Sequence, residues 1–206
     1  MISNPSRLNS DHHVLVIDAS VAINLLGTGR PADLLRALNQ RVLIDEMALK
    51  EVTIDPFNKL PGHEAIEALV RSSLIFPVRL SALAFEVFLE LTGANPPDDL
   101  GDGEAATIAK SFDISAVPVI DERKATRVSL SLRPKHPILH TIDILACSAV
   151  TTALSRQELG DAIYAALFHA RMRVPRPCRD WVCAVVGPER AKGCPSLGSV
   201  KDLGPG

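Results

Sequence analysis

The stretch Val14-Leu15-Val16-Ile17-Asp18 is a short apolar run that ends on an aspartate. A second such run, Val117-Pro118-Val119-Ile120-Asp121, follows about a hundred residues later. Short runs rich in β-branched residues predict buried strands of a parallel sheet. Ligands of open α/β sheets bind beyond the carboxyl ends of the strands, so both aspartates are expected at one rim. Either aspartate alone could simply cap a helix, but two of them at one rim favour a cation site.

The rest of the chain alternates between strand-like and helix-like patterns. Three further strands are expected at residues 41–44, 74–78 and 137–140. Helices are expected at 19–26, 32–38, 45–52, 61–70, 81–91, 102–110, 122–128, 142–154 and 155–173. Asp102 is the expected N-cap of its helix. The alternation predicts an α/β fold of three layers, with a central, mostly parallel sheet of about five strands flanked by helices.

Composition narrows the class of protein. The chain has 206 residues, of which 47% are hydrophobic and 22% charged, and this predicts a folded domain with a sizeable core. A net charge of -2 excludes a broadly basic nucleic-acid binder, and 4% aromatic residues argue against a base-stacking platform. No apolar stretch has the length of a membrane span, and the polar start is unlike a signal peptide, so we expect a soluble, cytoplasmic protein. We expect the folded domain at residues 1–174 and a Pro-, Gly- and Cys-containing tail at 175–206.

The cysteines give a weak signal. Cys147 lies in an apolar stretch and is expected to be a small buried hydrophobe. Cys178, Cys183 and Cys194 fall in the tail and, together with His169, could supply four zinc ligands. Their spacing matches no common zinc module, so free thiols are the main expectation.

Four acids occupy positions that could converge on one cleft: Asp18, Glu51, Glu104 and Asp121. Carboxylates gathered in one cleft repel each other until a cation binds, and Mg²⁺ and Mn²⁺ prefer oxygen ligands. Each acid also has a structural alternative. Glu104 would be favoured by the helix dipole in the first turn of its helix, and Glu51 could be an ordinary exposed helix residue.

The order and spacing of four sequence blocks resemble the PIN-domain family of metal-dependent ribonucleases, which includes the toxins of many prokaryotic toxin–antitoxin pairs. The blocks are residues 16–26, 46–52, 100–105 and 119–127, and the resemblance covers about residues 14–170. It implies that Asp18, Glu51, Glu104 and Asp121 ligate Mg²⁺ or Mn²⁺ and carry catalysis. It also implies supporting hydrogen bonds from Ser20 and Asn24, and contacts of the RNA backbone with Arg123, Lys124 and Arg127. A solvated helix face is the alternative for those three basic residues.

The chain departs from the family pattern at two acids. Glu104 stands where many family toxins carry an aspartate, and its longer side chain would change the spacing of metal ligands. Asp143 is a candidate for an extra acid near the rim.

The predicted function is that of a metal-dependent endoribonuclease, with an antitoxin protein as a partner if the nuclease is a toxin. One alternative is a PIN-fold RNA- or protein-binding regulatory module with little or no nuclease activity. A second is a phosphoryl-transfer hydrolase, which usually needs another acid two residues after the first, where this chain has Ser20. Homodimerisation through Phe85, Phe88 and Leu89 is a further hypothesis, with burial in the core as its alternative.

Overall fold

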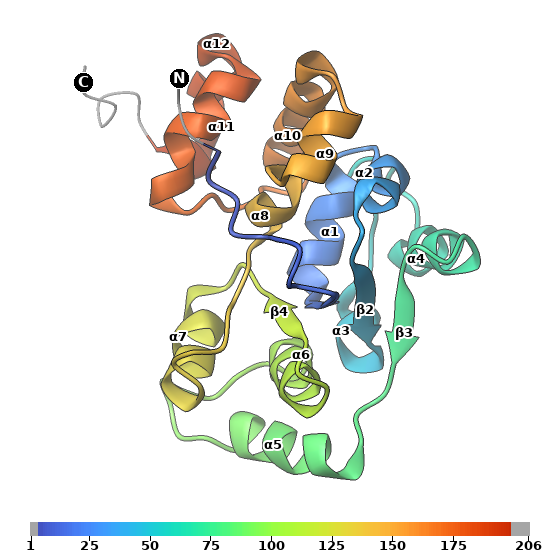
Figure 1. Ribbon diagram of the computed structural model, residues 1–206, viewed down its shortest axis with the longest axis vertical. Helices are drawn as coiled ribbons and strands as arrows, with labels where there is room; N and C mark the ends of the chain where they lie inside the picture. The colour runs from blue at the N-terminus through green and yellow to red at the C-terminus, as the bar shows by residue number, and fades with distance from the viewer. Residues whose placement is uncertain (1–3, 199–206) are drawn as a thin grey trace.

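A parallel four-stranded sheet forms the centre of the molecule in a computed structural model that describes residues 4–198 (Figure 1). The strands are β1 Val14–Ile17, β2 Arg41–Asp45, β3 Phe76–Val78 and β4 Val117–Val119, in the order β3-β2-β1-β4. Ile17 of β1 is in register with Ile44 on one side and with Val119 on the other. The carboxyl ends of β1, β2 and β4 therefore share one edge, as the sequence predicts.

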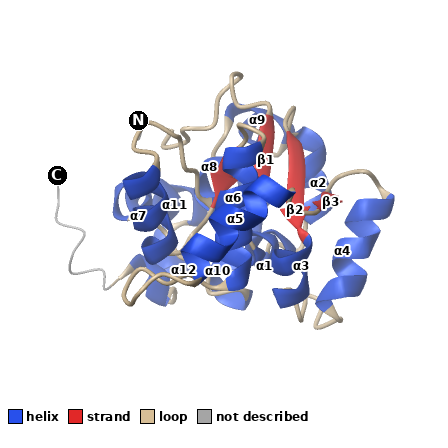
Figure 2. Ribbon diagram, turned by 90° about the horizontal axis from the view of Figure 1, so that it is seen from below, coloured by secondary structure: helices blue, strands red, loops and turns tan. Residues whose placement is uncertain are grey.

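Helices connect the strands and cover both faces of the sheet (Figure 2). The first seven are α1 Ala19–Gly27, α2 Pro31–Ala37, α3 Glu46–Glu51, α4 Gly62–Arg71, α5 Ala82–Thr92, α6 Asp102–Asp113 and α7 Arg123–Leu132. Successive strand residues point to opposite faces, so Leu15 and Ile17 join the larger core while Val16 joins a small cluster on the other face. A separate core beneath α5, α6 and α7 completes the three-layer arrangement.

The chain after residue 140 continues as helices. These are α8 Thr141–Leu145, α9 Ser148–Ala153, α10 Arg156–His169, α11 Arg179–Val186 and α12 Pro188–Lys192, with short 3₁₀ turns at Arg176–Cys178 and Pro195–Leu197. Trp181 and Val182 of α11 are buried in the larger core. A Cβ atom on Gly160 of α10 would lie 2.8 Å from the carbonyl oxygen of Val185, so glycine lets α11 approach this closely.

The predicted fifth strand is wrong: the segment 137–140 forms only a single parallel bridge, at Leu139, to β4. The backbone of Leu139 makes two hydrogen bonds to the chain around β4, of 2.9 and 3.0 Å. Pairing stops there because Pro137 has no N–H to donate and His140 is already the N-cap of α8.

Three helix boundaries also differ from the prediction. Gly101, not Asp102, is the N-cap of α6, and Asp102 is the first residue of the helix. The helix expected at 142–154 is interrupted by the extended backbone of Cys147, which separates α8 from α9. The helix expected to reach residue 173 ends at His169, because Arg171 adopts a left-handed conformation with φ of 54°.

All four cysteines are free thiols, and three of them, Cys147, Cys178 and Cys194, are buried. Burial raises the pKa of each of these three thiols, which keeps them protonated at neutral pH. Within residues 4–198, Cys178, Cys183, Cys194 and His169 form no group that could hold a zinc ion. Of the helices in this range, none combines the length and the apolar character that crossing a membrane requires.

The packing of α11 makes a testable prediction about stability. Trp181→Ala should lower the free energy of unfolding by about 3–5 kcal/mol, because it removes a large side chain from the core. Leu83→Ala on α5 is the control: Leu83 is 72% exposed, so its loss should cost less than about 0.5 kcal/mol. Urea denaturation measures both values, and a loss below about 1 kcal/mol for Trp181→Ala would contradict the packing described.

Candidate functional site

The four predicted acids, Asp18, Glu51, Glu104 and Asp121, line one cleft of about 530 Å³ at the carboxyl edge of the sheet. Asp18 and Asp121 come from adjacent strand ends, because the backbone N–H of Asp18 donates to the carbonyl of Val119 at 3.1 Å. Glu51 reaches the cleft from the end of α3, and Glu104 from the first turn of α6. The fold thus brings to one place acids that the sequence spreads over about a hundred residues.

Asp18 is buried, and hydrogen-bond donors reach only one of its two carboxylate oxygens. Its Oδ2 atom caps α1 by accepting hydrogen bonds from the backbone N–H of Ser20 at 3.2 Å and from the Ser20 hydroxyl at 2.7 Å. Its Oδ1 atom is buried and has no hydrogen-bond donor among residues 4–198. Burial raises the pKa of Asp18, against the effect of the Ser20 hydrogen bonds. The cap uses one oxygen and leaves the other free for a ligand.

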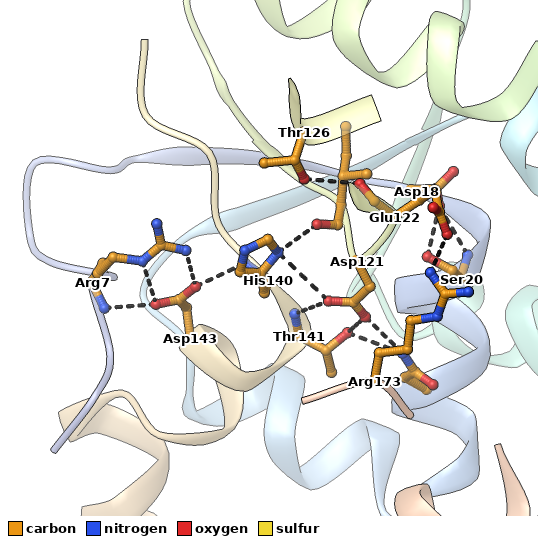
Figure 3. A network of polar contacts seen from close by, with 12 residues as sticks. Arg7, Asp18, Ser20, Asp121, Glu122, Thr126, His140, Thr141, Asp143 and Arg173 are labelled. Carbon is orange, nitrogen blue, oxygen red and sulfur yellow. Dashed lines mark hydrogen bonds and ion pairs between the residues drawn. The ribbon is translucent and has the colours of Figure 1, made fainter. Parts of the chain in front are cut away.

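Asp121 is held by three donors (Figure 3). Its carboxylate accepts from the Asn24 side-chain amide at 2.7 Å, from the backbone N–H of Thr141 at 2.9 Å and from the Thr141 hydroxyl. Burial raises the pKa of Asp121, and the hydrogen bonds from Thr141 and Asn24 oppose that rise. Thr141 was not among the predicted residues. The only feature of the sequence that could have indicated Thr141 is its position, since this hydroxyl-bearing residue directly follows the segment that lies beside β4.

Glu51 and Glu104 are linked through the start of α6. Glu51 Oε1 accepts a hydrogen bond of 2.8 Å from the backbone N–H of Gly103. A Cβ atom at position 103 would lie 2.7 Å from that same oxygen, so any larger residue there would displace the Glu51 carboxylate from this position. Burial raises the pKa of Glu104, and the negative charge of Asp18 adds to the rise.

The donor set fits a hard divalent cation in composition and charge. Carboxylate oxygens are the ligands that such cations prefer, and the unpartnered Oδ1 of Asp18 is the kind of atom a cation would satisfy. The raised pKa values of Asp18, Glu104 and Asp121 show that the cleft disfavours negative charge when nothing positive is bound. As the side chains stand, no three His, Cys, Asp or Glu residues in the described range are close enough together to hold a metal ion.

The predicted basic residues lie beside this cleft and do not line it. Arg123 and Arg127 of α7 line a neighbouring cleft that shares Asp121 with the first. Lys124 lies 3.8 Å from Asp99, and its positive charge partly offsets the rise in the pKa of Glu104.

Asp143 is a structural residue. It is 1% exposed and binds Arg7 through the backbone N–H at 2.8 Å and the guanidinium at 2.7 Å. In Figure 3 this pair lies on one side of His140, and Asp121 lies on the other. The N-terminal segment, not the cleft, therefore uses this carboxylate.

The sequence analysis missed three charged residues that line the cleft: Glu122, Arg171 and Arg173. The left-handed backbone of Arg171 ends α10 and turns the chain toward α7, where Arg173 forms an ion pair with Glu122. A helix-like pattern that runs on to residue 173 hides this turn, so nothing in the periodicity marks these residues.

Comparisons with known proteins support the resemblance noted in the sequence. Neither a search of curated proteins nor a search of solved structures found a match to the chain. A family model described as a PIN domain matches residues 14–145, which include all four strands and all four acids of the cleft. The chain belongs to the PIN-domain family.

Proposed function

We propose that this protein is a metal-dependent endoribonuclease that hydrolyses RNA phosphodiester bonds at the cleft of Asp18, Glu51, Glu104 and Asp121. Membership of the PIN-domain family supports a nuclease-type function in general. The observation that carries the finer proposal is the buried Oδ1 of Asp18, which has no donor within residues 4–198 and lies in a cleft with four more acids.

A structural role does not account for this arrangement. A helix cap needs one acceptor oxygen, and a serine at position 18 would supply it without burying a charge. Burying a carboxylate without full pairing is costly, and proteins tend to keep such groups where they perform chemistry. The same reasoning disfavours a regulatory module without activity, which has no need of three acids with raised pKa values.

In this proposal the four acids would hold one or two Mg²⁺ or Mn²⁺ ions. A bound divalent cation lowers the pKa of a water molecule and neutralises charge on a phosphate. Ser20 orients the carboxylate of Asp18, while Asn24 and Thr141 orient that of Asp121. Such partners fix the direction of a ligand oxygen, and their loss typically costs about 10- to 100-fold in metal affinity or activity.

The proposal extends to a toxin role, in which an antitoxin protein would be a second partner. Homodimerisation belongs to the same extended proposal. Phe88 is buried in the core and is not available for it, while Phe85 and Leu89 on α5 are 42% and 52% exposed. Any dimer contact on α5 would therefore involve Phe85 and Leu89.

RNA cleavage is the direct test. The wild type should cut a panel of structured and single-stranded RNAs when Mg²⁺ or Mn²⁺ is present, and EDTA should abolish the cuts. Asp18→Asn and Asp121→Asn should each lower the rate by at least about 100-fold, more than the loss of an orienting partner costs. Thr141→Val should fall within the 10- to 100-fold range because it removes only one donor to Asp121.

Asp161→Asn is the matched control for these variants, since Asp161 is exposed on α10 and pairs with Arg190 outside the cleft. It should cleave like the wild type. Folded wild-type protein that cuts no RNA with either metal would contradict the proposal. Growth of cells expressing the wild type or Asp18→Asn extends the test to the toxin role.

The stability of Asp18→Asn separates function from structure. An asparagine keeps an acceptor oxygen for Ser20 and removes a buried charge whose pKa is already raised. The metal-free variant should therefore have a free energy of unfolding at pH 7 equal to or above that of the wild type. Urea denaturation in EDTA measures it. A loss of more than about 1 kcal/mol, the typical cost of a lost N-cap, would show that Asp18 serves the fold instead.

The pH dependence of metal binding follows from the raised pKa values of Asp18, Glu104 and Asp121. A carboxyl with a raised folded pKa favours folding when protonated, so the metal-free protein loses this contribution as the pH rises through that value. Protons also compete with the metal for the same oxygens. The rise in Tm caused by Mn²⁺ should therefore be larger at about pH 8 than at about pH 5.5. Equal rises at both pH values would contradict this linkage.

A further inference from the structure

A second cleft, of about 740 Å³, adjoins the acidic one and shares Asp121 and Arg173 with it. One wall is α7, and the other is the C-terminal segment from Arg173 to Ser196. That second wall lies beyond residues 14–145, which the family model matches. The cleft is therefore built in part by a segment that the matched family region does not include.

The lining of this cleft is strongly positive, although the whole chain carries a net charge of -2. Among residues 4–198, Asp121 is the only acid in the lining, and the lining also holds four arginines: Arg123, Arg127, Arg173 and Arg179. Asp121 lies at the boundary with the acidic cleft and is already bound by Asn24 and Thr141. An anionic ligand would find four guanidinium groups, two of which are already paired with acids outside the lining.

Two of these arginines have no acid partner among residues 4–198. Arg127 pairs with Asp98, and Arg173 pairs with Glu122, whereas Arg123 and Arg179 form no ion pair within that range. The Nε–H of Arg179 is also buried without an acceptor there. A buried donor left unsatisfied costs about 1–3 kcal/mol, and more when it is charged. The site therefore lacks an acceptor, and a phosphate oxygen matches the planar donors of arginine well.

The cleft also offers an apolar surface of the right size for a nucleotide. Leu130 and Val174 line it from opposite walls, together with Pro175 and Pro195. Pockets of roughly 300–1,000 Å³ lined by apolar side chains and a few polar groups are typical of small-ligand sites. In single-stranded RNA the bases are free to leave the stack and enter such a pocket, which paired bases cannot do.

We propose that this cleft binds the nucleotide next to the scissile phosphodiester of single-stranded RNA. Arg123 and Arg179 contact its phosphates, and its base lies against Leu130 and Val174. The proposal rests on the proposed nuclease function, because it takes the acidic cleft as the place of cleavage. It makes the C-terminal segment, and not only the matched PIN domain, a determinant of which RNA is bound.

RNA binding without cleavage tests the phosphate contacts. Fluorescence anisotropy of a labelled single-stranded RNA in EDTA gives Kd at several salt concentrations. Arg179→Ala and Arg123→Ala should each raise Kd by about 10-fold, which corresponds to about 1.4 kcal/mol. Each should also reduce the slope of log K against log salt by about 0.7, the value expected for one lost phosphate contact on a single strand. Arg179→Lys should restore part of the affinity, since lysine keeps the charge.

The matched control is Arg71→Ala. Arg71 lies on α4, on the opposite side of the molecule from α7 in Figure 1, and its side chain is 70% exposed. This variant should bind RNA like the wild type. Thermal unfolding checks that each variant is folded. If Arg179→Ala does not fold, Arg123→Ala still tests the proposal, because Arg123 is exposed. Affinities within twofold of the wild type for the folded variants would overturn the proposal.

The base contact has its own test. The wild type should bind single-stranded RNA more tightly than an oligonucleotide of the same length whose sugars carry no bases. Leu130→Ala should reduce that preference by at least about threefold, and Leu83→Ala, at an exposed leucine outside the cleft, should not. An unchanged preference in Leu130→Ala would overturn the base site.

These results separate the two proposals. Arginine-dependent RNA binding in EDTA without any metal-dependent cleavage would support the cleft and contradict the nuclease. Metal-dependent cleavage with wild-type RNA binding in both arginine variants would support the nuclease and overturn the cleft.

Discussion

The parallel pairing of β1 with β4 is the constraint on which the rest of the structure depends. Leu15, Val16 and Ile17 are fully buried, and their register with Val117, Pro118 and Val119 leaves no freedom to slide. A shift by one residue would move every side chain to the opposite face of the sheet. The same register places Asp18 beside the end of β4, next to Asp121. The core packing that stabilises the fold thus also fixes the separation of the two aspartates.

Burying Asp18 and Asp121 makes folding less favourable, although the proposed function depends on both carboxylates. Asn24 and Thr141 offset part of the cost at Asp121, and Ser20 does so at one oxygen of Asp18. Even so, the pKa values of both carboxyls remain raised, because the hydrogen bonds do not compensate fully for lost hydration. A fold selected for stability alone would have neutral groups here. In the proposed function, this residual cost would favour a bound cation at this edge of the sheet.

The sequence predicts the sheet, and the edge that Asp18 and Asp121 share, because both depend on local patterns. The apolar runs ending at Asp18 and Asp121 are short, strongly β-branched and followed directly by helices, so the alternation of elements is visible in the chain. The prediction fails where tertiary contacts decide the conformation. Pro137 and the cap at His140 reduce the expected fifth strand to one bridge. The left-handed Arg171 turns the chain away from a helical pattern that otherwise continues. The first of these differences places Thr141 at the site, and the second places Arg173 there.

The net charge is also a poor guide to nucleic-acid binding, because it too is blind to how the fold arranges the residues. A value of -2 averages over a surface on which acids and arginines are unevenly distributed, and it argues against nucleic-acid binding only when the charges are mixed evenly. Within residues 4–198, four arginines line one cleft, whereas five acids and two arginines line the adjoining one, with Asp121 and Arg173 at their shared boundary. In the proposed function, an RNA strand crossing that boundary would meet arginines beside the point of cleavage, and the carboxylates that would hold the metal at the scissile phosphodiester. The opposite charges of the two clefts therefore suit one polyanionic substrate better than two separate ligands.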